Sequence, residues 1–363
     1  NYKMKIYKAA IIGLGPSGLA VNKLIYGEKD YAIIAFENKQ FKNRDNFFGF
    51  WLTSWMKPFE KQIEKKWYYW TISDENVIVN HNDENNPYCV ISFKKWKDFC
   101  LDTINKLDIV PEKVIKYIRH DNYYKIITDK NKEYFAEKIY DSRNIKEKKQ
   151  ELLQHFYGLN IITQEKKFND KKLTLMHFTK EENLLHFIYV LPFTENQALV
   201  ESTVFSRKVC KEEWYRKNIY EFLKINNITN YKEISSEQGT IPMFFAEEKI
   251  SKDPNIFNIG IRGGACKPST GYVFSFLIKQ IQLLKNTNKN YVHIHKYIDK
   301  LMDKTFLNYL KSNNENGKSF LSLAKNLNGT EFKDFMMGQS NFLTKLKIIR
   351  SMPKLAFIKS LFK

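Results

Sequence analysis

The chain has 363 residues, of which 43% are apolar and 15% aromatic, and this composition suits about two globular domains. The net charge is +19, but 52 of the 59 basic residues are lysines, whereas nucleic-acid sites favour the bidentate fork of Arg, so we expect no nucleic-acid partner. The four cysteines lie far apart, the N-terminus is polar, and no apolar run approaches the ~20 residues of a spanning helix, so we expect a cytosolic protein with reduced thiols and no metal site.

The stretch from Ala9 to Glu37 has the pattern of a dinucleotide-binding unit. An apolar strand over 9–12 leads into a glycine-rich loop over 13–18, a helical segment over 19–26 and a second apolar strand over 31–36. Glu37 then stands where an acid can accept hydrogen bonds from the ribose of an adenosine. A lone GxGxxG often arises as an ordinary glycine turn, but strand, loop, helix, strand and acid in this order are much more specific.

Each glycine of the loop has a physical role. Gly13 permits the tight turn after the strand, Gly15 lets the backbone approach a pyrophosphate, and Gly18 lets helix and strand pack closely. Pro16 and Ser17 stand at the start of the helix, where N–H groups and the helix dipole favour phosphate. We therefore predict that these five residues bind a dinucleotide cofactor.

Residues 47–70 are rich in aromatic side chains and hold four of the six tryptophans. Two interpretations stay open. The rings fill the core, as large aromatic side chains commonly do, or they form the wall of a large apolar pocket. Residues 93–107 follow with the pattern of an amphipathic helix.

The middle of the chain is predicted to be mostly β-structure. Alternation of polar and apolar residues from 152 to 205 favours an antiparallel sheet with one face on a core or a ligand. The predicted strands cover 114–118, 123–128, 134–140, 154–158, 173–178, 185–191, 198–203, 237–243 and 256–260. Helices are predicted over 211–225 and 272–284.

The C-terminal tail, residues 341–363, has six basic residues and no acid. Phe342, Leu346, Ile349 and Met352 recur at helical spacing, and further apolar residues continue beyond Pro353. A basic amphipathic helix can lie in a membrane interface, so we expect this tail to contact a membrane surface. The alternative is a helix that covers the protein's own core while its lysines are solvated.

Six segments in order, together with the loop near the N-terminus, make the chain similar to a known family. They are QHFYG (154–158), LTLM (173–176), YVLPF (189–193), ALVEST (198–203), EQGTIPM (237–243) and GGACKPSTGY (263–272), and FMMG follows at 335–338. The set resembles the lycopene β-cyclases, flavoproteins of carotenoid synthesis. The resemblance covers nearly the whole chain.

The resemblance implies an α/β fold with a bound FAD. We expect a Rossmann-like FAD-binding domain of the glutathione-reductase and hydroxylase type, an inserted antiparallel β-sheet substrate domain and a C-terminal helical region. The expected FAD domain is discontinuous (1–60, 93–145 and 236–290). The substrate domain is expected over 61–92 and 146–235, and the membrane-contacting helical region over 291–363.

The resemblance also implies a reaction. The ψ ends of lycopene, an apolar polyene taken from the membrane, are cyclised to β rings by way of γ-carotene, with no net redox change. Such an enzyme is an intramolecular lyase or isomerase that acts with reduced FAD, which NADPH or NADH keeps reduced. We expect it in the cytoplasm, peripheral on the inner face of the cell membrane.

Glu201 is the predicted general acid. An alkene is a poor base, so its proton donor must be a carboxyl group that stays protonated, and burial raises a carboxyl pKa. Glu201 stands among apolar and small residues of a predicted strand and matches the first acid of the family's catalytic motif. Plant members carry a second acid where this chain has Ser202. The alternative for Glu201 is a surface ion pair with a lysine.

Glu237 is the second catalytic candidate, as the returning base or as a structural group at the start of a glycine- and proline-bearing turn. We give no catalytic role to His155, which suits a hydrogen-bonded core position.

The second glycine-rich loop lacks the Asp with which FAD hydroxylases usually bind the ribityl chain. We expect Gly263 and Gly264, together with Thr270 and Gly271, to bind the flavin through the loop before the next helix. Residues 268–271 are expected to cap that helix.

Two other functions remain open. One is an FAD-dependent oxidoreductase of the hydroxylase or prenyl-reductase type that acts on another lipid, with real redox turnover. The other is a non-enzymatic membrane- or nucleic-acid-binding protein. Ring type, one-ended or two-ended cyclisation, the choice of nicotinamide and the oligomeric state do not follow from the sequence.

Overall fold

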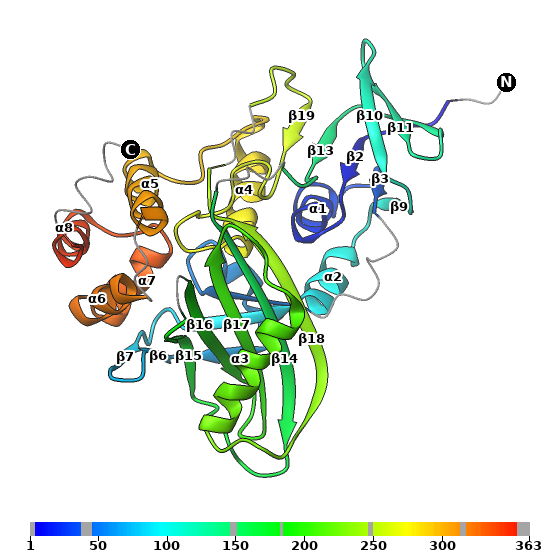
Figure 1. Cartoon of the computed structure of the whole chain (residues 1–363). Coiled ribbons are helices and arrows are strands. Elements are labelled where there is room, and N and C mark those ends of the chain that lie inside the picture. Colours follow the sequence, from blue (N-terminus) through cyan, green and yellow to red (C-terminus); the bar gives the residue numbers. More distant parts are fainter. Residues whose placement is uncertain are drawn as a thin grey trace.

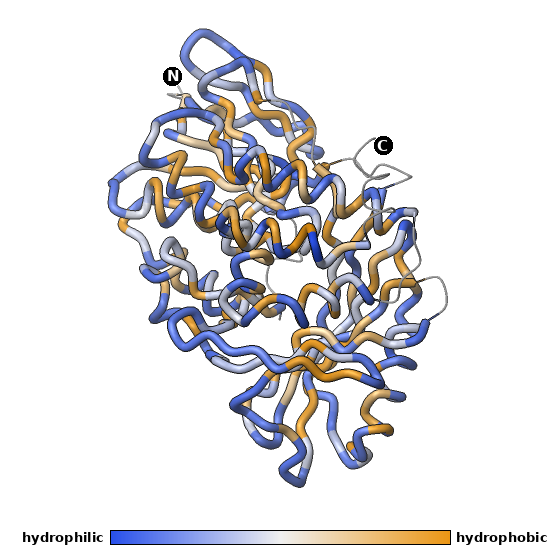
Figure 2. The backbone as a smooth tube through the Cα atoms, turned by 90° about the vertical axis from the view of Figure 1, so that its left-hand side faces the viewer, coloured by the Kyte–Doolittle hydropathy of each residue, from blue (hydrophilic) through white to orange (hydrophobic). Residues whose placement is uncertain are grey.

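Two large sheets, with helices around them, organise the molecule (Figure 1). This computed structural model describes residues 4–37, 46–145, 151–181, 184–245, 250–312 and 317–353. Apolar residues follow the strands and inner helices, and hydrophilic residues gather in the peripheral loops (Figure 2).

The first sheet is parallel and lies at the N-terminal side of the molecule. Its strand order is β19-β13-β2-β3-β9. The strands are β2 (Ala9–Ile12), β3 (Ala32–Phe36), β9 (Lys106–Val110), β13 (Ile139–Asp141) and β19 (Ile256–Asn258). All four residues of β2 are buried, because both faces of the sheet are covered.

Alternate residues of this sheet enter two different cores. Ile11 and Ala35 face two helices, α1 (Pro16–Val21) and α4 (Phe274–Thr287). Helix α1 continues as the π-helix η1 (Asn22–Tyr26). Ile12 and Ile34 face a second, smaller sheet on the other side. That sheet has the order β1-β12-β11-β10. Its strands are β1 (Ile6–Tyr7), β10 (Val114–Arg119), β11 (Tyr124–Thr128) and β12 (Glu133–Ala136).

The second large sheet has seven strands in the order β18-β14-β17-β16-β15-β6-β7. They are β6 (Tyr69–Ser73), β7 (Ile78–Asn82), β14 (Leu153–Thr163), β15 (Lys172–Phe178), β16 (Leu185–Pro192), β17 (Gln197–Ser206) and β18 (Tyr231–Pro242). Helix α3 (Glu212–Ile225) packs on one face through a core that includes Leu159, Val200 and Ile219. The opposite face is left for the cavity described below.

Further elements close the remaining sides. A three-stranded sheet joins β4 (Phe47–Trp51), β5 (Lys65–Trp67) and β8 (Tyr88–Ser92), with the 3-10 helix η3 (Lys57–Gln62) between. The C-terminal helices are α5 (Tyr297–Ser312), α6 (Lys318–Asn326), α7 (Gly329–Met336) and α8 (Phe342–Ser351). Helices α6 and α7 lie against edge strand β7, where His81 Nε2 is 2.9 Å from the Ala324 carbonyl oxygen.

Three local expectations were wrong. The predicted helix over 93–107 ends early, as α2 (Phe93–Leu101), and residues 106–110 instead form β9 beside β3. The single strand expected over 134–140 is divided between β12 and β13, which belong to different sheets. Strand β18 begins at Tyr231, six residues before the strand expected over 237–243.

Candidate active site

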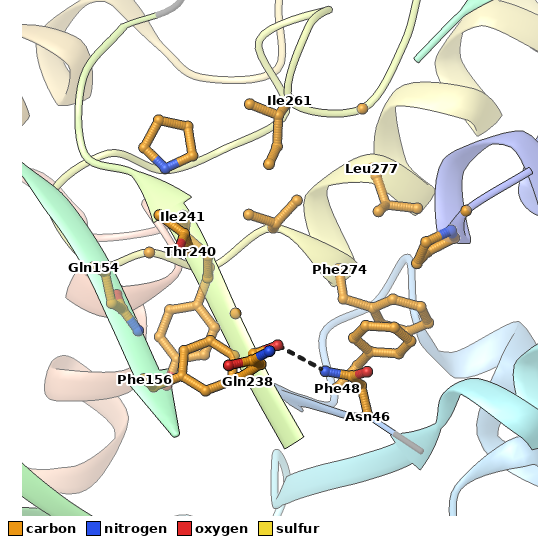
Figure 3. A pocket seen from close by; sticks show the side chains of 18 of the residues that line it. Asn46, Phe48, Gln154, Phe156, Gln238, Thr240, Ile241, Ile261, Phe274 and Leu277 are labelled. Carbon is orange, nitrogen blue, oxygen red and sulfur yellow. Dashed lines mark hydrogen bonds between the residues drawn. The ribbon is translucent and has the colours of Figure 1, made fainter. Parts of the chain in front are cut away.

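One cavity of about 1140 Å³ runs from the N-terminal glycine loop to the open face of the seven-stranded sheet. It exceeds the roughly 300–1,000 Å³ of ordinary small-molecule pockets, so it has room for more than one ligand. Figure 3 shows its middle part, where Gln154 and Phe156 of β14 lie opposite Phe48 of β4 and Phe274 of α4. Asn46 Nδ2 donates to the Gln238 carbonyl oxygen across the cavity rim, at 3.4 Å.

The glycine loop has the shape that the sequence predicts. Gly13 has φ +88°, and a Cβ on it would stand 2.4 Å from Ser142 Oγ. A Cβ on Gly18 would stand 2.1 Å from the Gly13 carbonyl oxygen, so only glycine allows this approach of helix to strand. Gly15, Pro16 and Ser17 line the cavity beside Gly13, whereas Gly18 lies behind them.

Glu37 lies at the end of β3, on the cavity wall. Its Oε2 accepts a hydrogen bond of 2.8 Å from the Leu14 N–H, which fastens the acid to the glycine loop. This placement agrees with a ribose-binding role, which stays a prediction.

The same end of the cavity includes residues that the sequence did not single out. Ser142 follows β13, and its hydroxyl donates to the Ile12 and Gly13 carbonyl oxygens at 2.9 and 3.0 Å. Arg143 forms an ion pair of 2.6 Å with the fully buried Asp141, whose carboxylate raises the pKa of the guanidinium. The sequence could have indicated these residues, because they follow the parallel strand β13 and ligands bind outside the carboxyl ends of such strands.

The second glycine-rich loop reaches the cavity at two of its four expected residues, Thr270 and Gly271. Gly260, Thr270 and Gly271 line it, whereas Gly263 and Gly264 line a separate cavity of about 210 Å³. The loop is held from behind by Gln280 of α4, which accepts from the Gly260 N–H and donates to the Gly263 carbonyl oxygen, both at 2.7 Å.

The expected helix cap over 268–271 was wrong. Helix α4 begins at Phe274 with Val273 as a cap residue that makes no side-chain hydrogen bond. Thr270 instead donates to the Met336 carbonyl oxygen at 3.3 Å.

Four residues form a row across the open face of the seven-stranded sheet. Gly158 of β14 is paired with Glu237 of β18 on one side and with Glu201 of β17 on the other. Glu201 is paired in turn with Tyr189 of β16. Directly paired residues point to the same face of a sheet, so Glu237, Glu201 and Tyr189 all reach the cavity that they line.

Gly158 makes this row possible. A Cβ on it would stand 3.2 Å from Glu237 Cγ and 3.5 Å from Glu201 Cβ. The two acidic side chains therefore lean over the same glycine from opposite sides. The sequence predicted that Glu201 and Glu237 lie on or near strands, but it did not predict that these strands are neighbours of the same strand.

Glu201 is buried, with 7% of its surface exposed. Burial raises the pKa of its carboxyl group to about 7, against the opposing effect of a 2.5 Å hydrogen bond from Thr203 Oγ1. The alternative of a surface ion pair with a lysine does not hold. A carboxyl group that is protonated in a large fraction of molecules near neutral pH can act as an acid.

Glu237 lies in the interior of β18, which agrees with the strand predicted from residue 237 and not with the turn that was also expected there. It is 6% exposed, and its Oε2 accepts a hydrogen bond of 2.8 Å from the Phe47 N–H of β4. This bond ties the acid to the strand that bears the cavity-lining Phe47 and Phe48.

The aromatic residues of 47–70 partly fill the core and partly form a cavity wall, so each interpretation holds for different residues. Phe47 and Phe48 line the cavity, whereas Trp51, Trp67 and Trp70 are fully buried in the core. Phe48 stacks on Phe274 with ring centroids 4.7 Å apart.

Three tyrosines line the cavity beside Glu201. The Tyr189 hydroxyl donates to that of Tyr88 at 2.9 Å, and Tyr272 donates to the same oxygen at 3.5 Å. Burial raises the pKa of all three phenols well above their usual range, so they stay neutral. Together with the phenylalanines they form an aromatic wall near the acid.

Side chains of the residues that alternate with this row along the strands point to the other face of the sheet. His155 is buried and hydrogen-bonded to Tyr215 and Ser206, which agrees with the structural role expected for it. Ser202, next to Glu201, lies 2.8 Å from His186 Nε2 on the α3 side and does not reach the cavity.

Helix α8 leaves part of its predicted apolar face exposed. Thr344, Ile348 and Met352 are buried against the protein, whereas Phe342 and Ile349 are 73% and 49% exposed. The apolar residues expected to continue the helix after Pro353 lie outside the described residues.

Among the residues that the structure describes, no group of His, Cys, Asp and Glu is arranged to hold a metal ion. Within the same ranges, no helix is both long and apolar enough to cross a membrane.

Residues 9–360 match the family described as lycopene cyclase protein. The chain belongs to this family. No curated protein sequence matches this lycopene cyclase family member.

Solved structures with the same fold as this lycopene cyclase family member include flavoenzymes. A geranylgeranyl bacteriochlorophyll reductase-like protein from Thermoplasma acidophilum is 12% identical, with a TM-score of 0.64 over 98% of this chain and 99% of that one. The p-nitrophenol 4-monooxygenase PnpA from Pseudomonas putida DLL-E4 is 11% identical, with a TM-score of 0.53 over 99% and 98%. CtdE, solved in complex with FAD and a substrate, is 12% identical, with a TM-score of 0.56 over 98% and 95%.

Proposed function

We propose that the protein is a lycopene β-cyclase, an isomerase that closes β rings at the ends of lycopene by way of γ-carotene and binds FAD. The observation that carries this proposal is the buried Glu201 in an aromatic-walled cavity that continues to a dinucleotide loop. Membership of the lycopene cyclase family supports it.

Glu201 would start the reaction. Its carboxylic acid gives the proton to a carbon of the terminal double bond, and the adjacent carbon becomes a cation. The neighbouring alkene attacks that cation and closes the six-membered ring. Loss of a proton from a carbon next to the new cationic centre leaves the ring alkene, so atoms and charge balance without any oxidant or reductant.

The surrounding residues suit a cationic intermediate. Water would add to such a cation, and a polyene that fills the cavity against the aromatic wall of Phe47, Phe48 and Tyr189 would exclude water from the acid. Neutral aromatic rings also attract a cation through their faces, by about 0.5–2 kcal/mol each. Glu237 lies across Gly158 from the acid and is our candidate for the base that removes the final proton.

FAD would lie along the cavity from Glu37 past Ser17 to Thr270 and Gly271. Gly13 lies close to Ser142 and Gly260 lies close to Ser17. Backbone from both glycine-rich loops therefore surrounds the position proposed for the phosphates. When bound and reduced, the flavin supplies electron density that stabilises positive charge nearby. We propose NADPH or NADH as the source of its electrons.

The substrate is a membrane lipid, so we also propose a peripheral location on the inner, cytoplasmic face of the cell membrane. Exposed Phe342 and Leu343 on α8 support this, with 73% and 69% of their surfaces accessible. Lys345 and Lys347 form ion pairs with Asp299 and Glu331 of the protein itself. The apolar side chains therefore contribute more to this proposal than these two lysines.

Expression in bacteria that accumulate lycopene tests the reaction, with chromatography of the extracted pigments. We expect conversion to β-carotene. A monocyclic product would restrict the activity to one end, and an ε ring would change the position of the base. Unchanged lycopene beside soluble yellow protein would contradict the proposal.

The second candidate is an FAD-dependent oxidoreductase of the hydroxylase or prenyl-reductase type acting on another lipid. The match in fold to the geranylgeranyl reductase-like protein favours it. Anaerobic stoichiometry separates the two functions. A cyclase consumes no nicotinamide beyond the initial reduction of its flavin, whereas a reductase consumes a fixed amount for each product.

A further inference from the structure

Thr203 is a polar residue in apolar surroundings. It lies on β17 and is fully buried. Its paired neighbours on the two adjacent strands are Phe156 of β14 (Figure 3) and Phe187 of β16, and all three residues line the large cavity. Valine has nearly the same shape and would bury no hydroxyl group, so the hydroxyl of Thr203 calls for an explanation.

This hydroxyl is directed at the buried acid. Glu201 precedes Thr203 by two residues on the same strand, so both side chains stand on the cavity face. Thr203 Oγ1 donates to Glu201 Oε1 at 2.5 Å. Both cross-strand neighbours of Thr203 are hydrocarbon rings, and within the described residues this is the one hydrogen bond of its hydroxyl.

The bond decides which carboxyl oxygen carries the acid proton. A protonated carboxyl group has one oxygen that bears hydrogen and one that only accepts. A proton on Oε1 would have to be donated to Thr203, and the buried hydroxyl hydrogen would then lack an acceptor, which is unfavourable. The proton therefore belongs on Oε2, while Oε1 accepts from Thr203.

The second carboxyl oxygen is the one that a ligand can reach. Glu201 lines the cavity, and its Oε2 makes no hydrogen bond within the described residues. It is nevertheless not among their buried unpaired oxygens, so part of its surface is accessible. A proton on Oε2 can therefore be given to a molecule in the cavity.

We propose that Thr203 is a positioning residue, whose hydroxyl keeps Glu201 Oε1 as the accepting oxygen so that the acid proton stands on Oε2 and faces the substrate. This inference rests on the proposed function, because it concerns the same proton transfer. The Oε2–H bond breaks as a C–H bond forms at the terminal alkene, and its electron pair stays on the carboxylate. Thr203 continues to donate to Oε1 and stabilises that charge.

Other titratable side chains line the cavity beside Glu201. They are Glu237 of β18, Tyr189 of β16, Tyr88 of β8, and Tyr272, which follows the second glycine-rich loop. Burial raises the pKa of each of the three phenols well above its usual range, so they stay neutral. A pH-dependent measurement on Glu201 must therefore be separated from Glu237.

Thr203→Val tests the proposal, because valine keeps the shape and removes the hydroxyl. We expect kcat to fall about 3- to 10-fold, as for the loss of one hydrogen bond, while KM stays within about twofold. The loss of activity at high pH should move upward by about 0.5–1 pH unit, because the missing bond favours the charged carboxylate. A residue that only supported the fold would lower activity without this upward shift.

Two further variants are matched to this one. Thr203→Ser retains the hydroxyl and should keep both the rate and the pH dependence of the unaltered protein. Thr163, on β14 of the same sheet, is buried and donates to the Glu165 and Asn196 carbonyl oxygens at 2.7 and 3.0 Å, away from the cavity. Thr163→Val should therefore change neither quantity.

Infrared absorption follows the acid without turnover. The carbonyl stretch of protonated Glu201 is the band that is missing in Glu201→Gln. It should disappear at a pH about 0.5–1 unit higher in Thr203→Val than in the unaltered protein. Its presence in Glu237→Gln separates it from the second acid.

Three results would overturn the proposal. Unchanged kcat and pH dependence in Thr203→Val would mean that the acid needs no fixed proton. Equal losses in the valine and serine variants, without a shift in pH dependence, would mean that Thr203 only packs the sheet. An unaltered protein that forms no cyclised product would defeat the proposed function and this role together, whereas the first two results leave the proposed function intact.

Discussion

At the scale of single residues, the environment of Glu201 decides what the protein can do. The strand pattern predicted an acid among apolar neighbours, and the structure shows it buried with one hydrogen bond, from Thr203. Removal from water, rather than a charged partner, is the main cause of its raised pKa. This is the physical condition under which a glutamic acid can protonate an alkene at neutral pH.

Glu201→Gln should abolish cyclisation while FAD stays bound. The amide keeps the shape but has no proton to give, and general acid catalysis contributes about 10²- to 10⁴-fold. Product per flavin, measured by chromatography and absorbance, checks this. Glu195→Gln, an exposed acid paired with Lys166, is the control and should keep full activity. Product formation at the normal rate in Glu201→Gln would refute the role.

Activity should fall as pH rises through about 7, because the acid form of Glu201 is then lost. Stability should change in the same direction. The folded-state pKa lies above the unfolded value of 4.5, so the contribution of this group is complete below pH 4.5 and lost as pH rises through about 7.

Urea unfolding of the unaltered protein and of Glu201→Gln at pH 5 and pH 8 measures this effect. From pH 5 to pH 8, the free energy of unfolding of the unaltered protein should fall by about 2–3 kcal/mol relative to that of the variant. A difference that does not depend on pH would show that burial leaves this pKa unchanged.

At the scale of secondary-structure elements, the register of three strands creates the acid pair. Glu201 and Glu237 are brought together only because β14 lies between β17 and β18 with Gly158 in line with both. A one-residue shift would turn either acid to the α3 face of the sheet. Glycine at the central position lets the two side chains converge.

Gly158→Ala should therefore lower the turnover rate more than it lowers stability. The added methyl group would meet Leu199 Cδ1 at 3.0 Å and Glu237 Cγ at 3.2 Å, so Glu237 must move. Overpacking of this kind costs about 1–3 kcal/mol. We expect at least a tenfold loss of turnover with FAD still bound. The exposed Ile162→Ala on the same strand is the control, and equal effects of both changes on turnover would argue against the acid pair.

At the scale of the whole molecule, a buried ionic network joins the C-terminal helices to the loop at the cavity. Lys267 pairs with Asp303 of α5, and Ser269 donates to the same carboxylate oxygen at 2.6 Å. Lys345 of α8 pairs with Asp299 of α5 at 2.7 Å. The helices thus hold the loop that ends at Gly271, in addition to covering the core.

Asp303→Asn should destabilise the protein by about 3–5 kcal/mol, because it leaves the Lys267 ammonium buried without its charged partner. Denaturant unfolding measures the change. Asp98→Asn, which breaks the exposed pair with Lys94, should alter stability by less than about 0.5 kcal/mol. Equal stability of the two variants would show that the network contributes little.

The exposed apolar side chains of α8 give a prediction for the whole molecule. Replacing Phe342 and Leu343 with Ser should weaken binding to vesicles containing anionic lipid at least about tenfold, because each buried side chain of this size contributes about 1.5–3 kcal/mol. Co-sedimentation with the vesicles is the measurement. Ile225→Ser, which removes an apolar side chain that is 79% exposed on α3, is the control. Unchanged binding by the double variant would place the membrane contact elsewhere.

Much of the fold could be predicted where the signals are local. The strand over 9–12 and the helix over 211–225 agree with β2 and α3 to within one residue. The helix expected over 93–107 was wrong at its C-terminal end, because residues 106–110 pair as a strand with β3, some 70 residues earlier in the chain. The positions of Gly263 and Gly264, away from the large cavity, depend on the packing of Gln280 behind them.

The sequence by itself determined the family and the cofactor loop. The glycines, helix start and acid of residues 9–37 act within one short unit, and the order of the later motifs needs no structure to be read. Only the tertiary structure decided that Glu201, Glu237 and Gly158 meet, that Gln154 faces Gly271, and that α8 buries Ile348 rather than Phe342. These contacts join residues far apart along the chain, and they follow from strand register and helix packing that no local pattern encodes.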